Sequence, residues 1–176
     1  MSNKKIVLDA NVLYGNFVRD LLLSLFYAGI YEAKWTDKIT QEWTGHLLKN
    51  RTDITPKKLE RTLALMNGIT PSALVERYQE YIPTVNLPDK DDRHVVAAAI
   101  AAGAHKILTW NLGDFPEQVL KSFNVIAQSP DKFFNELILE DPIEIVGIFR
   151  SVRERMKSPP VCVDLFLNIY KQIVCI

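Results

Sequence analysis

The sequence is poor in cysteine and has no excess of charge of either sign. Its two cysteines, Cys162 and Cys175, both lie near the end of the 176-residue chain, and they provide neither zinc-site spacing nor a disulfide framework. This pattern fits a protein of the reducing cytoplasm, where disulfides rarely persist. The 21 basic and 21 acidic residues cancel. No overall positive field therefore attracts nucleic acid, and a polyanionic partner would need a local basic patch, bound metal ions, or both.

Long apolar runs are also absent. The apolar run that follows the basic start is interrupted by Asp9 and Asn11, so we expect neither a signal peptide nor a membrane-spanning segment. The hydrophobic content of 48% and charged content of 24% are typical of a soluble globular protein. Because no low-complexity segment or long linker divides the chain, we expect one domain over residues 1–176.

The spacing of apolar residues predicts an α/β protein with a parallel sheet. Short apolar runs predict strands at 5–8, 33–35, 105–110 and 123–127. Helical spacing, together with capping residues, predicts helices at 14–28, 36–49, 55–68, 70–82, 89–103, 130–139, 141–157 and 161–176. The third and fourth of these helices resemble a hairpin inserted into the α/β frame. The last two form a helical extension at the C-terminus.

The most unusual stretch is 88–103, where three carboxylates precede an alanine-rich helix that ends at Gly103. One Asp at this position is explained by a helix cap and by the helix dipole. The three residues Asp89, Asp91 and Asp92, however, repel one another unless a cation lies between them. A cap and a metal site both remain open from this stretch alone.

Other polar residues follow the predicted strands. Asp9 ends the first strand, and Asn111 and Asp114 follow the strand at 105–110. The carboxyl ends of parallel strands meet at one edge of a sheet, so these side chains and the 88–103 acids can share that edge. Loops are polar in any case, which leaves coincidence as the alternative. Glu42 borders the inward face of its helix, and from its position alone it is better explained as a solvated residue.

A cluster of this kind suits phosphodiester chemistry. Hard cations such as Mg²⁺ prefer oxygen ligands and retain several waters. Bound ions polarise phosphoryl oxygens, lower the pKa of a bound water and stabilise the leaving oxygen. They also neutralise the acids, which would allow a protein of zero net charge to accept an acidic polymer.

Four segments, in this order, resemble the PIN domain, and the branch containing the bacterial VapC-type toxins is the most similar. They are Ile6–Leu13 (IVLDANVL), Glu42 within its helix, Pro88–Ala99 (PDKDDRHVVAAA) and Ile107–Pro116 (ILTWNLGDFP). The similarity runs from about Ile6 to Phe134. It implies a three-layer α/β/α PIN-like fold with a central parallel sheet, a core over about 5–135, and C-terminal helices over about 142–176 that lie outside the family pattern.

The resemblance also implies a function. It implies a metal-dependent endoribonuclease, using Mg²⁺ or Mn²⁺, that hydrolyses RNA phosphodiester bonds and leaves a 5′-phosphate. It further implies a cytoplasmic toxin of a type II toxin-antitoxin pair, whose partners are an RNA substrate and a small antitoxin protein. The helices after Pro142 could serve a homodimer, the antitoxin or only the core.

The resemblance assigns roles to particular residues. Those matching the metal-holding catalytic acids are Asp9, Glu42, Asp92 and Asp114, with Asp91 as the reserve metal ligand. Asn11 matches the polar residue that accompanies the first acid, and Asn111 stands where many members have Asp; we expect both to contribute to substrate binding. Arg19 could reach a substrate phosphate, although an ordinary charge on a helix face is the simpler interpretation.

Several further residues have two interpretations. His94 could transfer a proton but is better explained as a surface histidine beside a helix cap. Lys57, Lys58 and Arg61 could contact an RNA backbone or form a solvated face. Trp110 could stack on a base, but it is better explained, like Trp35 and Trp43, as part of the core or its edge.

Two other functions fit the same residues less well. A phosphatase with Asp9 as nucleophile would normally carry a second acid two residues later, where this chain has Asn11. A non-catalytic RNA-binding or protein-interaction module that retains the PIN-like fold is the alternative from another class, and Asn111 leaves it open.

Overall fold

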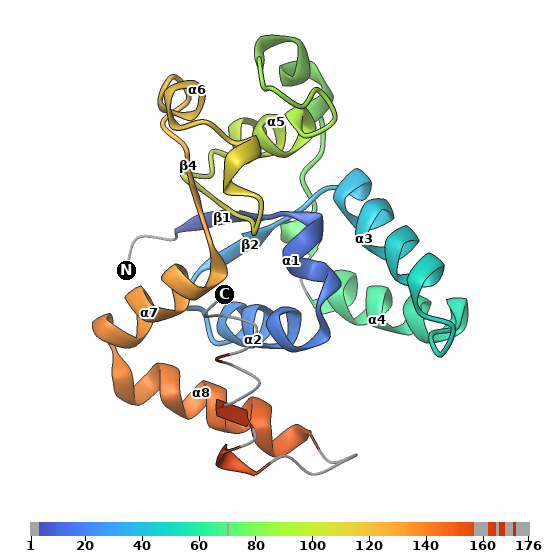
Figure 1. The fold of residues 1–176 in the computed structure, drawn as a ribbon, viewed down its shortest axis with the longest axis vertical. Helices are drawn as coiled ribbons and strands as arrows, with labels where there is room; N and C mark the ends of the chain where they lie inside the picture. The colour runs from blue at the N-terminus through green and yellow to red at the C-terminus, as the bar shows by residue number, and fades with distance from the viewer. Residues whose placement is uncertain (1–3, 70, 157–161, 165, 168–170, 172–176) are drawn as a thin grey trace.

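The centre of the molecule is a parallel sheet of four strands in the order β2-β1-β3-β4 (Figure 1). The computed structural model describes residues 4–69, 71–156, 162–164, 166–167 and 171. The strands are β1 (Lys5–Leu8), β2 (Glu32–Lys34), β3 (Lys106–Leu108) and β4 (Ile126–Gln128). On β1, Val7 lies opposite Lys34 on one side and Ile107 on the other. All four predicted strands are confirmed; β3 is shorter than predicted at both ends, and β4 begins later than predicted and ends one residue beyond the predicted end.

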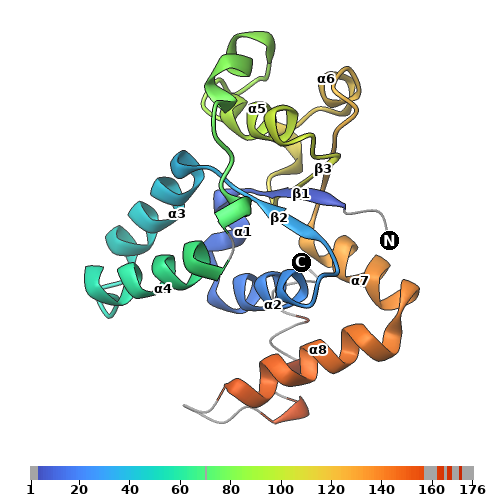
Figure 2. The same ribbon diagram turned by 180° about the vertical axis from the view of Figure 1, so that it is seen from behind.

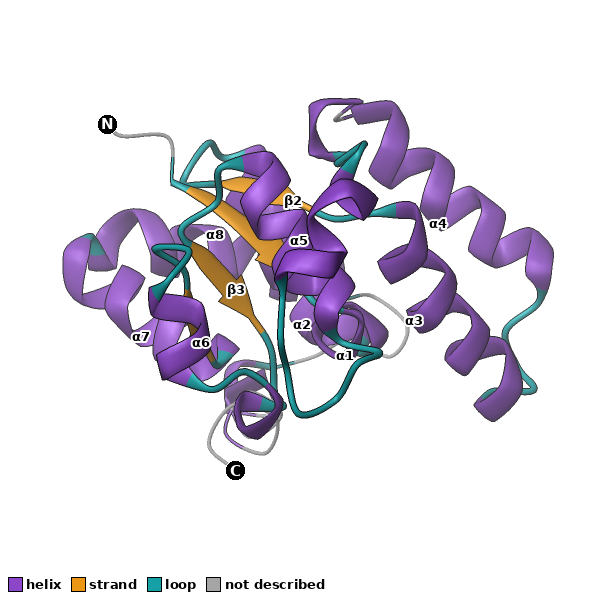
Figure 3. Cartoon of the chain, turned by 90° about the horizontal axis from the view of Figure 1, so that it is seen from above, coloured by secondary structure: helices purple, strands orange, loops and turns teal. Residues whose placement is uncertain are grey.

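Helices cover both faces of this sheet (Figures 1 and 3). One face carries α5 (Arg93–Ala102), which contacts β1 and β3. The opposite face carries α2 (Asn16–Tyr27) and α7 (Pro130–Glu140), and α8 (Pro142–Arg155) packs on both of these helices. The three-layer α/β/α architecture is therefore confirmed, and so is α8 as an addition after the α/β core.

The remaining helices lie at the edges of the sheet. Figure 2 shows α3 and α4 side by side as an arm to one side of the strands. These helices are α1 (Ala10–Tyr14), α3 (Asp37–Asn50), α4 (Pro56–Ile69) and α6 (Glu117–Lys121), with 3₁₀ turns η1 (Pro71–Ala73), η2 (Tyr78–Thr84) and η3 (Leu112–Asp114). The short helix α1, directly after β1, was not predicted.

Local sequence explains where the main helices begin and end. The Thr36 hydroxyl accepts a hydrogen bond from the Ile39 N–H, which caps α3 where the sequence predicts. Gly103 has φ = 62° at the end of α5, a left-handed conformation that only glycine adopts without strain. Pro130 and Pro142 occupy the first turns of α7 and α8, where a missing N–H costs nothing.

The predicted helix at 70–82 is wrong, and with it the inserted helical hairpin. The chain forms η1 and then runs extended beside the end of β2: the Trp35 N–H donates to the Ala73 carbonyl (3.0 Å) and the Val75 N–H donates to the Trp35 carbonyl (2.8 Å). Arg77 then has φ = 58°, which separates this extended stretch from the 3₁₀ turn η2 and prevents one continuous α-helix. Pairing with a distant segment satisfies these backbone groups, and local apolar spacing cannot reveal such pairing. Thr70, the predicted cap, lies outside the described residues.

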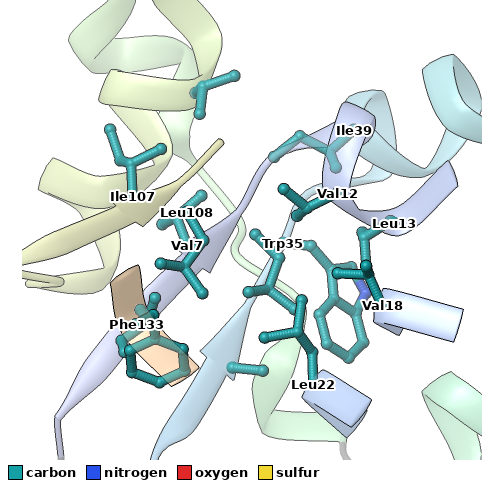
Figure 4. Packing of buried hydrophobic residues seen from close by; sticks show 14 of the residues in the cluster. Val7, Val12, Leu13, Val18, Leu22, Trp35, Ile39, Ile107, Leu108 and Phe133 are labelled. Carbon is teal, nitrogen blue, oxygen red and sulfur yellow. The ribbon is translucent and has the colours of Figure 1, made fainter. Parts of the chain in front are cut away.

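The buried side chains form one connected core across the layers (Figure 4). Residues of β1 and β3, including Val7 and Ile107, meet residues of α1, α2 and α7 there. Trp35 and Trp43 are buried as predicted. The rings of Phe134 and Phe149 meet edge to face at 5.5 Å, so α8 joins this core through α7.

The predicted helix at 161–176 lies largely outside the described residues. Within the described ranges, no helix combines the length and the apolar composition that crossing a bilayer requires.

Candidate metal-binding active site

Asp9 is a buried carboxylate at the carboxyl end of β1, with only 5% of its surface exposed. Its Oδ1 accepts a hydrogen bond from the Ala10 N–H (2.7 Å), so it caps α1. Burial raises the pKa of Asp9 and the nearby charge of Glu42 raises it further, whereas hydrogen bonds from Thr109 and Ala10 lower it. The side chain is thus held in one orientation in a place where negative charge is costly.

A small polar network joins Asp9 to the end of β3. Asp9 Oδ2 accepts hydrogen bonds from Asn11 Nδ2 (2.8 Å) and from the Thr109 hydroxyl (2.7 Å). Asn11 Nδ2 also donates to Thr109 Oγ1 (2.9 Å), and Asn11 Oδ1 accepts from the Trp110 N–H (3.1 Å). Asn11 therefore acts on Asp9 and on the β3 end together; its predicted contact with substrate stays a prediction.

Asp92 begins α5 close to the other acids. Burial raises the pKa of Asp92 to about 6, and the charges of Asp9, Asp114 and Asp89 contribute to the rise. Its side chain makes no capping hydrogen bond to α5 in the described structure. Asp9, more than 80 positions away in the sequence, thus contributes to the raised pKa of Asp92.

Glu42 joins this group from α3. Its charge contributes to the raised pKa of Asp9, so it lies near the end of β1. Its Oε1 lies 3.0 Å from Nε2 of His94 and 3.7 Å from Nζ of Lys38. The half-buried carboxylate therefore faces the acidic group and is not the freely solvated residue that its helix position alone indicated.

The predicted residues around the 88–91 turn and η3 occupy different environments. Asp91 is exposed, and its N–H donates to Asp89 Oδ1 (2.8 Å), so Asp89 shapes this turn. Asp114 is half-buried in η3. Asn111 is exposed, and its N–H donates to Thr109 Oγ1 (3.1 Å). Asp114 therefore lies with Asp9 and Asp92, while Asp91 and Asn111 lie at the solvent side.

Arg19 is placed apart from this acidic group. It is buried with 8% exposure, its guanidinium donates to the carbonyls of Leu13 and Tyr14, and it lies over the Trp43 ring at 4.8 Å. Burial lowers its pKa. These contacts join α1, α2 and α3, which is a structural role; its predicted contact with substrate phosphate has no support in this geometry.

Sequence reasoning missed two features of this site. Thr109 was considered only as a strand residue, yet it is completely buried and its hydroxyl links Asp9, Asn11 and Asn111. Its position directly after the apolar residues of β3 could have indicated that Thr109 is buried at the carboxyl end of the strand. His94 was expected at the surface, but it is 2% exposed. That expectation is wrong because α5 turns its first residues toward α3 and the sheet.

The donor set fits a hard divalent cation in its chemistry. Carboxylate oxygens are the ligands that Mg²⁺ prefers. The pKa of Asp92 is raised mainly by burial and further by the charges of Asp9, Asp114 and Asp89, which a cation would neutralise. Among the described residues, no three His, Cys, Asp or Glu side chains are close enough together to form a metal-binding group as they stand. Binding would therefore require side-chain rotation toward a common centre.

A family comparison accounts for this arrangement. The model of the PIN domain matches residues 5–113, well over half of the chain. The chain belongs to the PIN domain family. The matched range includes Asp9, Glu42 and Asp92 and ends one residue before Asp114. PIN domains form a family of nucleases that are typically metal-dependent, which agrees with the oxygen-rich edge of this PIN domain.

One curated relative is similar over part of this PIN domain. The protein named "Putative ribonuclease VapC50" of Mycobacterium tuberculosis (strain ATCC 25618 / H37Rv) is 42% identical over 67 residues. The matched segment spans 38% of this chain and 38% of that protein. No solved structure matches the chain.

The Thr109 hydroxyl provides a first test of the site. We expect Thr109→Val to leave two hydrogen-bond donors without their acceptor, since the hydroxyl accepts from Asn11 and from the Asn111 N–H. Unfolding free energy should fall by about 1–3 kcal/mol. If Asp9 holds a metal for the nuclease activity of the PIN family, that activity should fall about 10- to 100-fold, the range seen when outer-shell partners of metal ligands are removed. Urea unfolding and an RNA cleavage assay measure the two effects.

The matched control is Thr109→Ser, which keeps the hydroxyl and loses only a methyl group. We expect it to retain most of the activity. Equal activity of the Val and Ser variants would contradict a role of the hydroxyl in orienting Asp9.

Proposed function

We propose that this PIN domain is an endoribonuclease that hydrolyses RNA phosphodiester bonds with Mg²⁺ or Mn²⁺. The observation that carries the proposal is the shared electrostatics of Asp9, Glu42, Asp92 and Asp114, which come from four separate elements. Burial is the main reason that the pKa values of Asp92 and Asp9 are raised; the charges of Asp9 and Asp114 add to the first rise, and the charge of Glu42 adds to the second. Mutually repelling carboxylates destabilise a fold unless they serve a ligand of opposite charge.

The chain's own residues would prepare the reaction. Asp9 would present one carboxylate oxygen in an orientation fixed by Asn11 and Thr109. Glu42 and Asp92 would face it from α3 and α5, and Asp114 would complete the oxygen set from η3. When bound, a divalent cation would polarise the phosphoryl oxygens and lower the pKa of the attacking water. The four acids would then hold the cation, with Asp91 at the solvent side as the reserve ligand.

We also propose that the protein acts as the toxin of a type II toxin-antitoxin pair. The support is the partial similarity to the Mycobacterium tuberculosis protein whose name contains VapC. In this proposal a small antitoxin protein is the natural inhibitor, and its tail would cover the acidic edge. An adjacent reading frame that encodes a small DNA-binding protein would support this role.

Calorimetric titration with Mn²⁺ tests the enzyme proposal. We expect the wild-type protein to bind Mn²⁺ and to cleave a single-stranded RNA only when a divalent ion is present. Addition of EDTA should abolish the cleavage, and a new excess of Mg²⁺ should restore it. A folded wild-type protein that binds no Mn²⁺ would contradict the proposal and would favour a non-catalytic module with the PIN fold.

A further inference from the structure

We propose that His94 is a positioning residue that fixes the carboxylate of Glu42 for metal binding. The inference rests on the proposed function, because it concerns one of the proposed metal ligands. Its structural basis is independent of any ion: a buried imidazole on α5 contacts a half-buried carboxylate on α3, and the two residues lie 52 positions apart in sequence.

The protonation of the imidazole follows from its partner. Nε2 of His94 lies 3.0 Å from Oε1 of Glu42, which is hydrogen-bonding distance. An ionised carboxylate only accepts hydrogen bonds, so Nε2 must carry the proton. The other ring nitrogen, Nδ1, is buried and has no hydrogen-bond partner among the described residues. A position that served packing alone would favour an apolar ring, since a buried unpartnered nitrogen costs free energy. The contact with Glu42 explains the imidazole.

The same geometry leaves Glu42 ready to bind a cation. The contacts from His94 and Lys38 both reach Oε1. In the part of the chain that the structure describes, neither of these two contacts reaches Oε2. A donor on one oxygen fixes the rotation of a carboxylate and leaves the other oxygen for the cation, which is how residues behind metal ligands usually act.

Lys38 offers a matched comparison. It contacts the same oxygen of Glu42 at 3.7 Å, but its side chain is 42% exposed, whereas that of His94 is 2% exposed. An exposed ammonium on a flexible stem fixes a partner weakly. If His94 acts through this short contact of a buried, rigid ring, removal of Lys38 should matter much less than removal of the imidazole.

Mn²⁺ titration calorimetry on a set of variants tests the role. We expect His94→Leu to weaken Mn²⁺ binding about 10-fold or more, as removal of a partner behind a metal ligand usually does. His94→Gln places an amide N–H near the position of Nε2 and should restore affinity to within about threefold of the wild type, a smaller loss than full removal of the partner causes. Lys38→Gln should change affinity by less than about threefold, as expected for an exposed pair. In a Glu42→Gln background, His94→Leu should cause no further loss, because the histidine would have no ligand to position.

A measurement without metal or activity complements this set. Nitrogen-15 NMR of the three histidines should show the His94 ring protonated at Nε2 in the wild-type protein. In Glu42→Gln, the nitrogen resonance of Nε2 of His94 should shift, whereas those of His105, which lies outside α3, should not. This experiment needs only the wild-type protein and Glu42→Gln, which changes a half-buried side chain. It therefore tests the contact between His94 and Glu42 even if His94→Leu does not fold.

The outcomes separate this inference from the proposed function. If the wild type binds no Mn²⁺, the proposed function fails and this inference fails with it. If the wild type binds Mn²⁺ and His94→Leu binds it equally well, only the role of His94 is overturned. The same holds if His94→Leu loses as much affinity in the Glu42→Gln background as in the wild type, or if Nε2 carries no proton.

Discussion

Replacing Asp9 with Asn is expected to reduce metal-dependent RNA cleavage by more than about 100-fold, since even outer-shell partners of metal ligands are worth about 10- to 100-fold. Asp9 is the acid that the polar network of Asn11 and Thr109 holds in place. The substitution removes the negative charge and one of the two oxygens while it keeps the shape of the side chain. Mn²⁺ affinity should fall together with activity.

The same substitution should leave the fold intact. An Asn at position 9 keeps only one oxygen for the three donors that now contact Asp9, which costs about 1 kcal/mol at a helix cap. Removing a buried charge compensates part of that loss, because burial is the main reason that the pKa of Asp9 is raised. Thermal unfolding by circular dichroism should therefore show a change of only a few degrees.

The chain offers a closely matched control. Asp141 also caps a helix, since its carboxylate accepts a hydrogen bond from the Glu144 N–H (3.0 Å) at the start of α8. Asp141→Asn makes the same chemical change away from the acidic group and should keep full nuclease activity. If Asp9→Asn also keeps full activity, Asp9 is not a metal-holding residue and the enzyme proposal is overturned.

Replacing Asp92 with Asn should abolish cleavage and, in the absence of metal, make the protein more stable at neutral pH. The pKa of Asp92 is raised to about 6 in the folded protein, above its ordinary value of 3.8. Between these values the folded state binds more protons than the unfolded state, so unfolding free energy falls as pH rises from about 4 to about 6. The loss of unfolding free energy caused by the ionised Asp92 side chain is fully present at pH 7 and absent below pH 4.

The expected gain is modest because Asp92 is only half-buried and solvent screens its charge. We expect Asp92→Asn to raise unfolding free energy by about 1 kcal/mol at pH 7, or about 2–4 °C in melting temperature for a chain of this size. At pH 4 the wild type and the variant should melt together. Differential scanning calorimetry in EDTA at the two pH values measures both differences.

The exposed neighbour Asp91 serves as the comparison for stability. Asp91→Asn removes the same formal charge one residue earlier in the sequence, where the side chain is open to solvent. Its effect on melting at pH 7 should be smaller than that of Asp92→Asn. Equal stabilisation by both variants would show that net charge, rather than the crowding of Asp92 by Asp9 and Asp114, sets the effect.

Wild-type protein and Asp92→Asn should also respond differently to metal. Mg²⁺ should raise the melting temperature of the wild type, since a ligand that binds only the folded state stabilises it. The variant should gain little. A trade of stability against function at one residue is what a charged binding site produces when its ligand is absent.

Strong local signals made most of the fold predictable. The apolar run of β1, the cap and proline signals of α3, α7 and α8, and the glycine after α5 act within a few residues of one another. The segment after α4 had equally good helical spacing, but its backbone pairs with Trp35, about forty residues earlier. Where a tertiary partner competes with local spacing, the sequence pattern fails for a physical reason.

Some features of the candidate site could likewise be predicted from local sequence, and others could not. The positions of Asp9 and Asp114 after parallel strands, and of Asp92 before α5, could be predicted, because parallel strands place their carboxyl ends at one edge. The environment of each side chain could not. His94 and Arg19 are charged or polar residues on helices, which are usually exposed, yet both are buried here against partners on other elements.

By itself, the sequence determined which segments along the chain form the strands and the main helices, since these depend on short-range patterns. It also determined which acids can meet at the sheet edge. The tertiary structure alone decided which polar side chains surround those acids. The contact of Thr109 with Asp9 spans 100 residues, and that of His94 with Glu42 spans 52. Contacts over such separations arise only when the layers pack, because burial, not local propensity, selects the partner of each polar group.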